Sequence, residues 1–233
     1  GRLPRLMPQG GPLRAQAKEL GLINDRGTEF FFNRVVLPIR DAGGAMVSVY
    51  GRSIDPSSDV PHLFPPGPRR GVFNRIGCLQ GREVILTEAP LDALSVAVMG
   101  SLNATASFGV TGFTADHLAL LLEGKIARVY CAYDADPAGD HGADQLAHDL
   151  AVHGIECLRV KWPVKDANDF LVAGGTRETF RALIDEARPV ATPQPRPGRS
   201  ARNQPPKPDA TGQPKDSASR TSLENIGPAD DPA

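Results

Sequence analysis

Three clusters of acidic residues follow apolar runs that are typical of buried strands. The clusters are Glu88 with Asp92, Asp134 with Asp136, and Asp166 with Asp169. In an open α/β sheet the carboxyl ends of parallel strands meet at one edge, where binding sites form. Carboxylates crowded at such an edge repel one another unless a cation lies among them. The spacing therefore predicts a site for a hard divalent cation with oxygen ligands, Mg²⁺ or Mn²⁺.

Each cluster by itself also has a structural explanation. Glu88 could cap the helix that follows it, and Asp92 lies in a first helical turn, where an acid is favoured. Asp134 and Asp136 could form an ordinary turn, but not a calcium loop, because the twelfth position is Gln145. The segment 166–169 could be a solvated helix cap. The placement of all three clusters at successive strand ends favours the metal site.

The elements that would position these residues alternate between strands and helices. Apolar runs predict strands at 83–87, 103–107, 127–133 and 155–160, and helical patterns predict helices at 90–99, 114–122, 137–153 and 176–187. This alternation predicts an α/β fold with an open, mainly parallel sheet and helices on both faces. The leucines at 120–122 and the strand valines are expected in its core. The order of the strands does not follow from the sequence.

A smaller α+β subdomain is expected before this sheet. It contains a helix at 12–20 and a hairpin of two strands, 34–40 and 45–51, around a glycine turn. At the other end, residues 189–233 hold ten of the 22 prolines and no aromatic residue, which predicts a disordered tail. The expected organisation is a linker at 1–14, the subdomain at 15–78, the α/β domain at 79–188 and the tail at 189–233.

The composition limits the classes of protein to which the chain can belong. The net charge is −1 at pH 7, which argues against a polybasic nucleic-acid binder but leaves room for a local basic groove. Its three cysteines form no C-x-x-C pair, so we expect neither a disulfide framework nor a zinc site in this segment. No apolar run is long enough for a membrane span. We therefore expect a cytoplasmic protein, and the initial Gly1 suggests a fragment.

The acidic clusters resemble the three signature blocks of the Toprim domain. The blocks are Glu88-Ala-Pro-Leu-Asp92, Asp134-Ala-Asp136-Pro-Ala-Gly139 and Lys165-Asp-Ala-Asn-Asp169. Two positions depart from the pattern of primases: Ala89 stands where glycine is usual, and Asn168 where many have a second aspartate. The second departure weakens position 168 as a metal ligand. The resemblance implies a Toprim-type sheet.

The upstream residues resemble the subdomain that precedes Toprim in DnaG-type primases. The similar stretches are Phe32-Asn-Arg34-Val-Val-Leu-Pro-Ile39 and Gly51-Arg52, while residues 62–67 replace the usual P-K-Y motif. This resembles primase-like proteins of phages and mobile elements, which often carry an upstream CHC2 zinc-binding domain. The resemblance extends over residues 15–187. No such zinc-binding domain is present in this sequence, so the resemblance does not imply that this segment recognises a template by itself.

The resemblance implies metal-dependent synthesis of RNA primers from nucleoside triphosphates on single-stranded DNA. A replicative helicase is a further expected partner. The implied catalytic residues are Glu88, Asp134 and Asp136, which would hold Mg²⁺ or Mn²⁺ together with Asp166 and Asp169. The residues expected to contact phosphates are Arg34, Arg52 and Lys165, although an exposed structural charge explains each of them equally well.

Other functions use similar residues. A Toprim nuclease would cleave DNA with the same acids, and a non-catalytic nucleic-acid-binding module would keep only the surface. A topoisomerase needs a nucleophilic tyrosine, but Tyr50, Tyr130 and Tyr133 all lie on predicted strands. A dehalogenase-like phosphatase also uses an Asp-x-Asp motif, but it places this motif after its first strand, whereas Asp134 follows the third.

Overall fold

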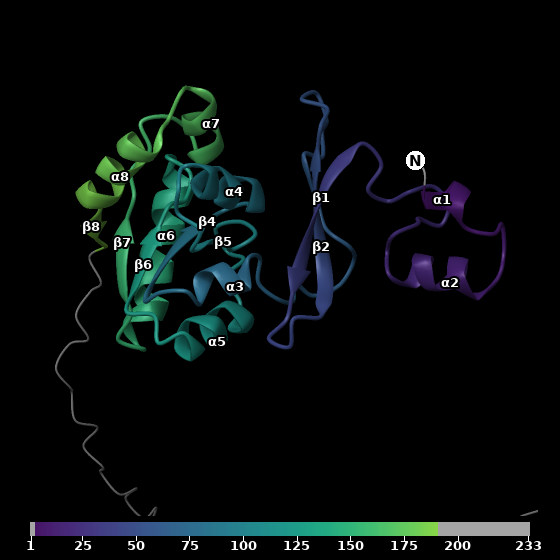
Figure 1. Ribbon diagram of the computed structural model, residues 1–233, viewed down its shortest axis with the longest axis horizontal. Coiled ribbons are helices and arrows are strands. Elements are labelled where there is room, and N and C mark those ends of the chain that lie inside the picture. Colours follow the sequence, from purple (N-terminus) through teal and green to yellow (C-terminus); the bar gives the residue numbers. More distant parts are fainter. Residues whose placement is uncertain (1–2, 191–233) are drawn as a thin grey trace, which may run out of the picture. The chain divides into compact units, whose positions relative to one another are not determined.

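An antiparallel three-stranded sheet forms the N-terminal part of the fold, in a computed structural model that describes residues 3–190 (Figure 1). Its strands are β1 (Arg34–Arg40), β2 (Met46–Ser53) and β3 (His62–Leu63). The predicted hairpin is confirmed, because β1 pairs with β2 in antiparallel register. The short strand β3 was not predicted. It pairs Arg52 with His62, so these two side chains come from directly opposite positions.

The second sheet has five strands in the order β5-β4-β6-β7-β8. Their bounds are β4 (Glu83–Thr87), β5 (Ala104–Ala106), β6 (Arg128–Cys131), β7 (Glu156–Arg159) and β8 (Arg188–Pro189). The first four are parallel, which confirms the mainly parallel open sheet. β8 pairs antiparallel with β7. The tail predicted from Pro189 is therefore wrong at its first residue, and its part from 191 to 233 lies outside the described residues.

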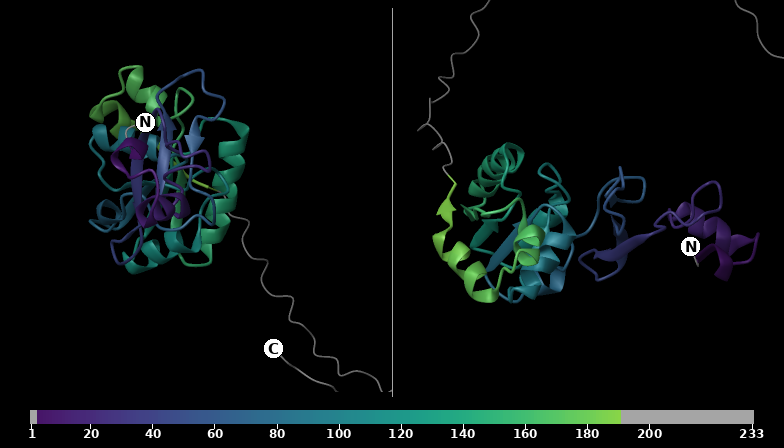
Figure 2. Two further views of the ribbon diagram at one scale, coloured as in Figure 1. Left: turned by 90° about the vertical axis from the view of Figure 1, so that its right-hand side faces the viewer. Right: turned by 90° about the horizontal axis from the view of Figure 1, so that it is seen from above.

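Helices cover both faces of this sheet, as the alternation of strands and helices predicts (Figure 2, right). They are α4 (Pro90–Val98), α5 (Ala115–Glu123), α6 (Pro137–Ala151), α7 (Ala167–Val172) and α8 (Arg177–Glu186). Along β4, Val84 and Leu86 pack against α5 and α6, whereas Ile85 packs against α4 and α8. This alternation is the period of two that a strand requires. One core prediction is wrong: Leu122 is 48% exposed, because it faces away from the sheet on α5.

Three helices precede the second sheet: α1 (Leu3–Leu6), α2 (Pro12–Glu19) and α3 (Arg75–Cys78). Only α2 was predicted. The segment that joins the two sheets is fixed at Gly71, whose N–H donates to an Asp116 carboxylate oxygen at 2.7 Å. Gly71 has φ +77°, and a Cβ there would lie 2.7 Å from the Arg40 carbonyl oxygen, so only glycine fits.

The predicted boundary between residues 78 and 79 stays a prediction. Hydrogen bonds cross it, since the Asn74 side chain donates to the carbonyl oxygens of Leu102 and Ala104 at 2.7 and 2.9 Å. Thr105 on β5 donates to the Phe73 carbonyl oxygen at 2.6 Å. Within residues 3–190, no helix is long and apolar enough to cross a membrane.

Candidate active site

The three acidic clusters follow adjacent strands. β4, β6 and β7 are neighbours in the sheet and run parallel, so their carboxyl ends lie side by side. Glu88 follows β4, Asp134 follows β6 within three residues, and Asp166 lies in the loop after β7. The structure thus brings the predicted clusters to a single edge, called the carboxylate edge below: Glu88, Asp134, Asp136 and Asp166.

Glu88 connects the first two strand ends. Its Oε1 accepts a hydrogen bond from the backbone N–H of Asp134 at 3.0 Å. Burial raises the pKa of Glu88, and the nearby charges of Asp134 and Asp136 add to this rise, against the hydrogen bond and Arg159. Helix α4 instead begins at Pro90, and its N-cap residue, Ala89, makes no side-chain cap. The structure therefore does not support the alternative explanation of Glu88 as a helix cap.

Lys165 lies between two of the carboxylates. Its Nζ is 3.5 Å from Oδ2 of Asp134 and 3.5 Å from Oδ2 of Asp166. Burial raises the pKa of Asp134, while the positive charge of Lys165 opposes this shift. The ammonium group thus supplies positive charge at a place where two carboxylates would otherwise repel each other.

Asp136 and Asp166 both cap helices. Oδ1 of Asp136 accepts from the Gly139 N–H at 2.8 Å at the start of α6, and Oδ1 of Asp166 accepts from the Asp169 N–H at 2.7 Å at the start of α7. The cap explanation is therefore correct for Asp166, and Asp136, for which an ordinary turn was the alternative, caps a helix as well. Each cap fixes the direction of its carboxylate. Asp169 is exposed in the first turn of α7.

Asp92 is the most buried carboxylate of this region, at 7% exposure. It accepts a hydrogen bond from the Asn168 N–H at 3.2 Å, and Ser95 on the same helix donates to the Asn168 side chain at 3.3 Å. Burial, together with the charges of Asp166 and Asp134, raises the pKa of Asp92 to about 7. Asp92 therefore joins α4 to α7 behind the carboxylate edge.

The donor chemistry of the carboxylate edge suits Mg²⁺ or Mn²⁺, because carboxylate oxygens are hard ligands. Burial and mutual repulsion raise the pKa of both Glu88 and Asp134, and a cation relieves both effects. Within residues 3–190, however, no three His, Cys, Asp or Glu side chains converge closely enough to form a ready metal cluster. The side chains of the carboxylate edge are thus of the kind that binds a divalent ion. In this structure the ammonium group of Lys165 is the cation that lies between Asp134 and Asp166.

The predicted basic residues have different surroundings. Arg52 and Lys165 line the same pocket as Glu88 and Asp134, a cavity of about 410 Å³ between the β2–β3 pair and the carboxylate edge. Arg34 does not line it. Its guanidinium donates to the backbone carbonyl of Val60 at 2.7 Å, which holds the loop before β3. The structure therefore brings two of the three basic residues to the acids.

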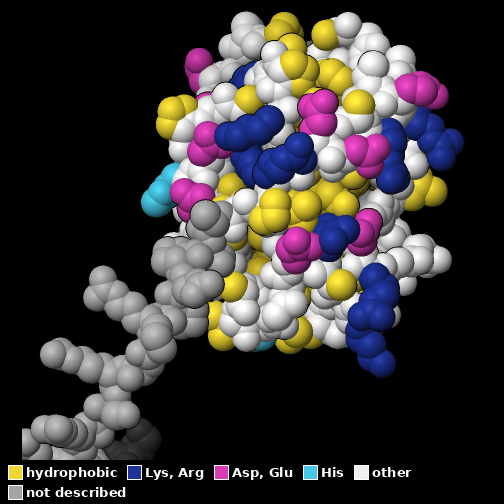
Figure 3. Space-filling view, turned by 90° about the vertical axis from the view of Figure 1, so that its left-hand side faces the viewer, with side chains coloured by type: hydrophobic (Ala, Val, Ile, Leu, Met, Phe, Trp, Pro, Cys, Tyr) yellow, Lys and Arg dark blue, Asp and Glu magenta, His cyan; other side chains and the backbone are white. Residues whose placement is uncertain are grey.

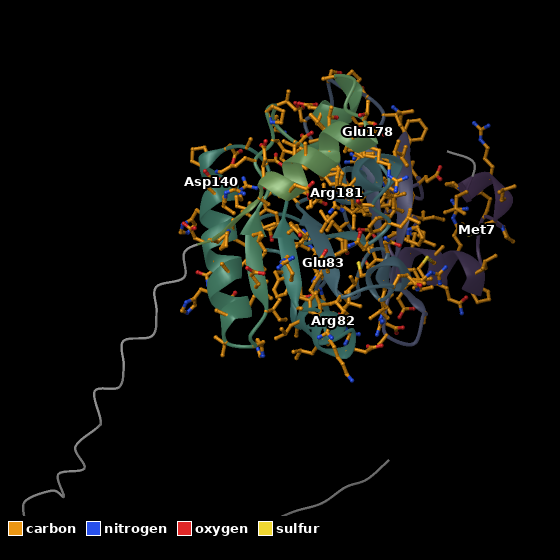
Figure 4. The ribbon with its side chains drawn as sticks, turned by 60° about the vertical axis from the view of Figure 1, so that its left-hand side comes forward. Met7, Arg82, Glu83, Asp140, Glu178 and Arg181 are labelled. Atoms are coloured by element: carbon orange, nitrogen blue, oxygen red, sulfur yellow. The ribbon has the colours of Figure 1, made fainter. Side chains whose placement is uncertain are left out.

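Sequence reasoning missed Arg159, a buried arginine on β7. Its guanidinium donates to the carbonyl oxygens of Tyr133 (2.7 Å), Asp134 (2.6 Å) and Val160 (3.1 Å). Its Nε also donates to an oxygen of Asp140 at 3.0 Å. Asp140 lies in the first turn of α6 (Figure 4). Arg159 thus holds the loop that carries Asp134. The sequence signal that could have identified Arg159 is an arginine within a mainly apolar predicted strand.

The pocket wall opposite the acids was also missed. His62 bridges two residues of β2: its Nδ1 is 2.8 Å from the Tyr50 hydroxyl and its Nε2 is 2.8 Å from the Arg52 guanidinium. Because arginine only donates, Nε2 must be the acceptor. Phe64 and Phe108 also line the pocket. Only the pairing of β3, too short to predict, brings His62 and Phe64 to the site.

Comparisons with known proteins agree with these features. Residues 85–171 match a family described as Toprim-like. The DNA primase of Escherichia coli K12 is 28% identical over 184 residues, which cover 72% of this chain and 31% of that protein. The DNA primase of Clostridium acetobutylicum is 30% identical over 201 residues, or 80% of this chain and 33% of that protein. The chain thus spans about a third of the length of these curated relatives.

Solved structures show the same likeness. The DnaG catalytic core has a TM-score of 0.65 and 26% identity, over 78% of this chain and 62% of that chain. The DnaG primase catalytic domain bound to single-stranded DNA has a TM-score of 0.65 and 27% identity, over 78% of this chain and 63% of that chain. The match with the DnaG catalytic core covers 78% of this chain and therefore extends well beyond residues 85–171.

Proposed function

We propose, on the premise that this chain contains a Toprim domain of the type found in DnaG primases, that it joins nucleoside triphosphates into short RNA primers on single-stranded DNA. The observation that carries the proposal is the contact between Glu88 and Asp134 across β4 and β6, beside Lys165 and a nucleotide-sized pocket. The same proposal makes the protein an enzyme of DNA replication that works in the cytoplasm.

Glu88, Asp134 and Asp136 would hold Mg²⁺ or Mn²⁺, with Asp166 and Asp169 completing the set of ligands. When bound, the metal would neutralise the triphosphate and favour ionisation of the attacking 3′-hydroxyl. Glu88 is suited to accept that proton, because burial raises its pKa and so makes its carboxylate a stronger base. When a nucleotide binds, the ammonium group of Lys165 would leave the carboxylates of Asp134 and Asp166 and contact phosphate oxygens instead.

The template and the nucleotides are proposed partners. Arg52 and Lys165 line the pocket and could contact phosphates there, whereas Arg34 would act by holding the loop before β3. A related catalytic domain was solved with single-stranded DNA, which supports DNA as a ligand for this fold. By contrast, the face in Figure 3 mixes Lys and Arg with Asp and Glu, so it offers no continuous basic track. A replicative helicase, as the partner that recruits the chain, stays a prediction.

The test is primer synthesis. The chain is incubated with single-stranded DNA, labelled nucleoside triphosphates and Mg²⁺ or Mn²⁺, and the products are separated by size. We expect short products with a 5′-triphosphate, and a loss of at least about 100-fold in Asp134→Asn and Glu88→Gln, because both remove charge at the metal. Asp149→Asn, on the exposed side of α6, is the matched control and should keep full activity.

Two outcomes would contradict the proposal. A shortened template without new product would make the chain a nuclease that uses the same acids. Binding of DNA without either product, in the presence of both metals, would make it a non-catalytic binding module.

A further inference from the structure

We infer that the ring of Phe64, together with Phe108, forms a stacking site for a nucleobase beside the carboxylate edge. This inference rests on the proposed function and deepens it, since it names the part of the ligand that the acids do not contact. Phe64 and Phe108 line the same pocket as Glu88, Asp134 and Lys165.

The face of the Phe64 ring is covered by the guanidinium group of an arginine, and not by another aromatic ring. The guanidinium carbon of Arg69 lies 3.7 Å from the ring centroid. The aromatic neighbours meet Phe64 at steep angles instead: Tyr50 at 57° with centroids 5.2 Å apart, and Phe108 at 73° with centroids 5.4 Å apart. The Phe64 ring is thus held by its neighbours, and the group on its face is an exposed side chain that a flat base could replace or sandwich.

Phe108 is fixed more rigidly than a surface phenylalanine needs to be. Its φ is +64°, a backbone conformation that large side chains rarely adopt. The turn is tied to the acids, because the Gly109 N–H donates to the Glu88 carbonyl oxygen at 2.9 Å. Its ring packs edge-on against His117, which is 1% exposed and bonded through Nε2 to the Ala106 carbonyl. Uncommon backbone conformations that the surroundings enforce cluster at ligand sites.

The chemistry of the pocket divides in the way that a nucleotide does. Carboxylates and Lys165, which suit phosphates with their metal, line the same pocket as the rings of Tyr50, Phe64 and Phe108, which suit a base. The cavity of about 410 Å³ falls within the size range of sites for small ligands. Stacking on an aromatic face tolerates every base, which suits an enzyme that must accept four nucleotides.

The experiment measures binding, not synthesis. Equilibrium dialysis with Mg²⁺ compares ATP with inorganic tripolyphosphate, which has the charges but no base. A single-stranded oligonucleotide and an abasic oligonucleotide of equal length form the second pair. The variants are Phe64→Ala, Phe64→Leu, which keeps apolar volume without a π face, and Phe64→Trp, which keeps stacking. Phe32→Ala is the matched control, an exposed phenylalanine outside the pocket.

We expect Phe64→Ala and Phe64→Leu to weaken binding of the base-containing ligand by about tenfold, the size of a lost base–aromatic stack. Binding of the base-free ligand should not change, and Phe64→Trp should bind like the wild type. A loss confined to ATP assigns the site to the incoming nucleotide, and a loss confined to the oligonucleotide assigns it to a template base. Either result supports a nucleobase site.

Equal losses for ligands with and without a base, or no loss in Phe64→Leu, would overturn the inference. Failure of the proposed function looks different. Wild-type protein that makes no primers but binds ATP in a Phe64-dependent way would refute primer synthesis and leave the stacking site standing. Primers made at the wild-type rate by Phe64→Leu, with unchanged affinity for both ATP and the oligonucleotide, would refute the stacking site alone.

Discussion

Replacing Arg159 by methionine should destabilise the fold by about 3–5 kcal/mol. Arg159 donates to the carbonyl oxygens of Tyr133, Asp134 and Val160, and also pairs with Asp140. The Asp140 pair contributes little, because the Asp140 side chain is 51% exposed and water screens it. The cost comes from buried carbonyl oxygens that lose their hydrogen-bond donor, at about 1–3 kcal/mol for each. The carbonyl of Asp134 costs less than the others, because solvent partly replaces the lost hydrogen bond.

Urea unfolding measures this change, with the fluorescence of Trp162 as the signal. Trp162 is the single tryptophan of the chain and is buried, stacked on Phe180 at 5.8 Å, so its emission reports loss of the core. Arg181→Met is the matched control, because Arg181 projects from α8 with 73% exposure (Figure 4) and should cost less than about 0.5 kcal/mol. If Arg159→Met cost less than about 1 kcal/mol, the carbonyls would not depend on Arg159 and the reasoning would be wrong.

Three further predictions concern the same edge. Burial raises the pKa of Asp92 from 3.8 to about 7, so the folded state binds its proton more tightly, and the stability present below pH 3.8 is lost as the pH rises to about 7. In Asp92→Asn, roughly 2–4 kcal/mol of this pH-dependent loss of stability should disappear, as urea unfolding at several pH values would measure. If the free energy of unfolding depended on pH equally in both proteins, this prediction would be contradicted. Gly139→Ala should lower the unfolding midpoint strongly, since its Cβ would meet the Asp134 carbonyl oxygen at 2.2 Å, whereas Gly81→Ala, with open space around it, should not. Mn²⁺ should raise the melting temperature of the wild type and not that of Asp134→Asn, as scanning calorimetry would show, and an equal rise in both would place the ion elsewhere.

The sequence allowed the second sheet and its acidic edge to be predicted because both depend on local patterns. A strand such as 83–87 has a continuous apolar run, and Pro90 marks the start of a helix. Helix α6, predicted to continue to residue 153 before Gly154, ends earlier, at Ala151. Parallel strands share one direction, so the acids after them had to reach one edge. Strand order was not available from the sequence, and the structure supplied the adjacency of β4, β6 and β7.

Other features depend on contacts between distant residues, which no local pattern contains. β3 has two residues and exists only through its pairing with β2, so the positions of His62 and Phe64 could not be predicted. β8 is likewise defined by its pairing with β7. The placement of Lys165 between Asp134 and Asp166 depends on the loop after β7, whose path is set by the caps and by Asp92. Local propensity does not determine such a path.

The order of β4, β6 and β7 also affects when the site can form during synthesis. Glu88 and Asp134 meet only after β6 has left the ribosome and paired with β4, and Asp166 joins them only after β7 has paired with β6. Parallel pairs need long crossovers, so these closures are slow compared with helix formation. A nascent chain that ends before residue 166 therefore lacks part of the carboxylate edge. The full set of acids, and any metal affinity that depends on it, appears only when most of the described sheet is already folded.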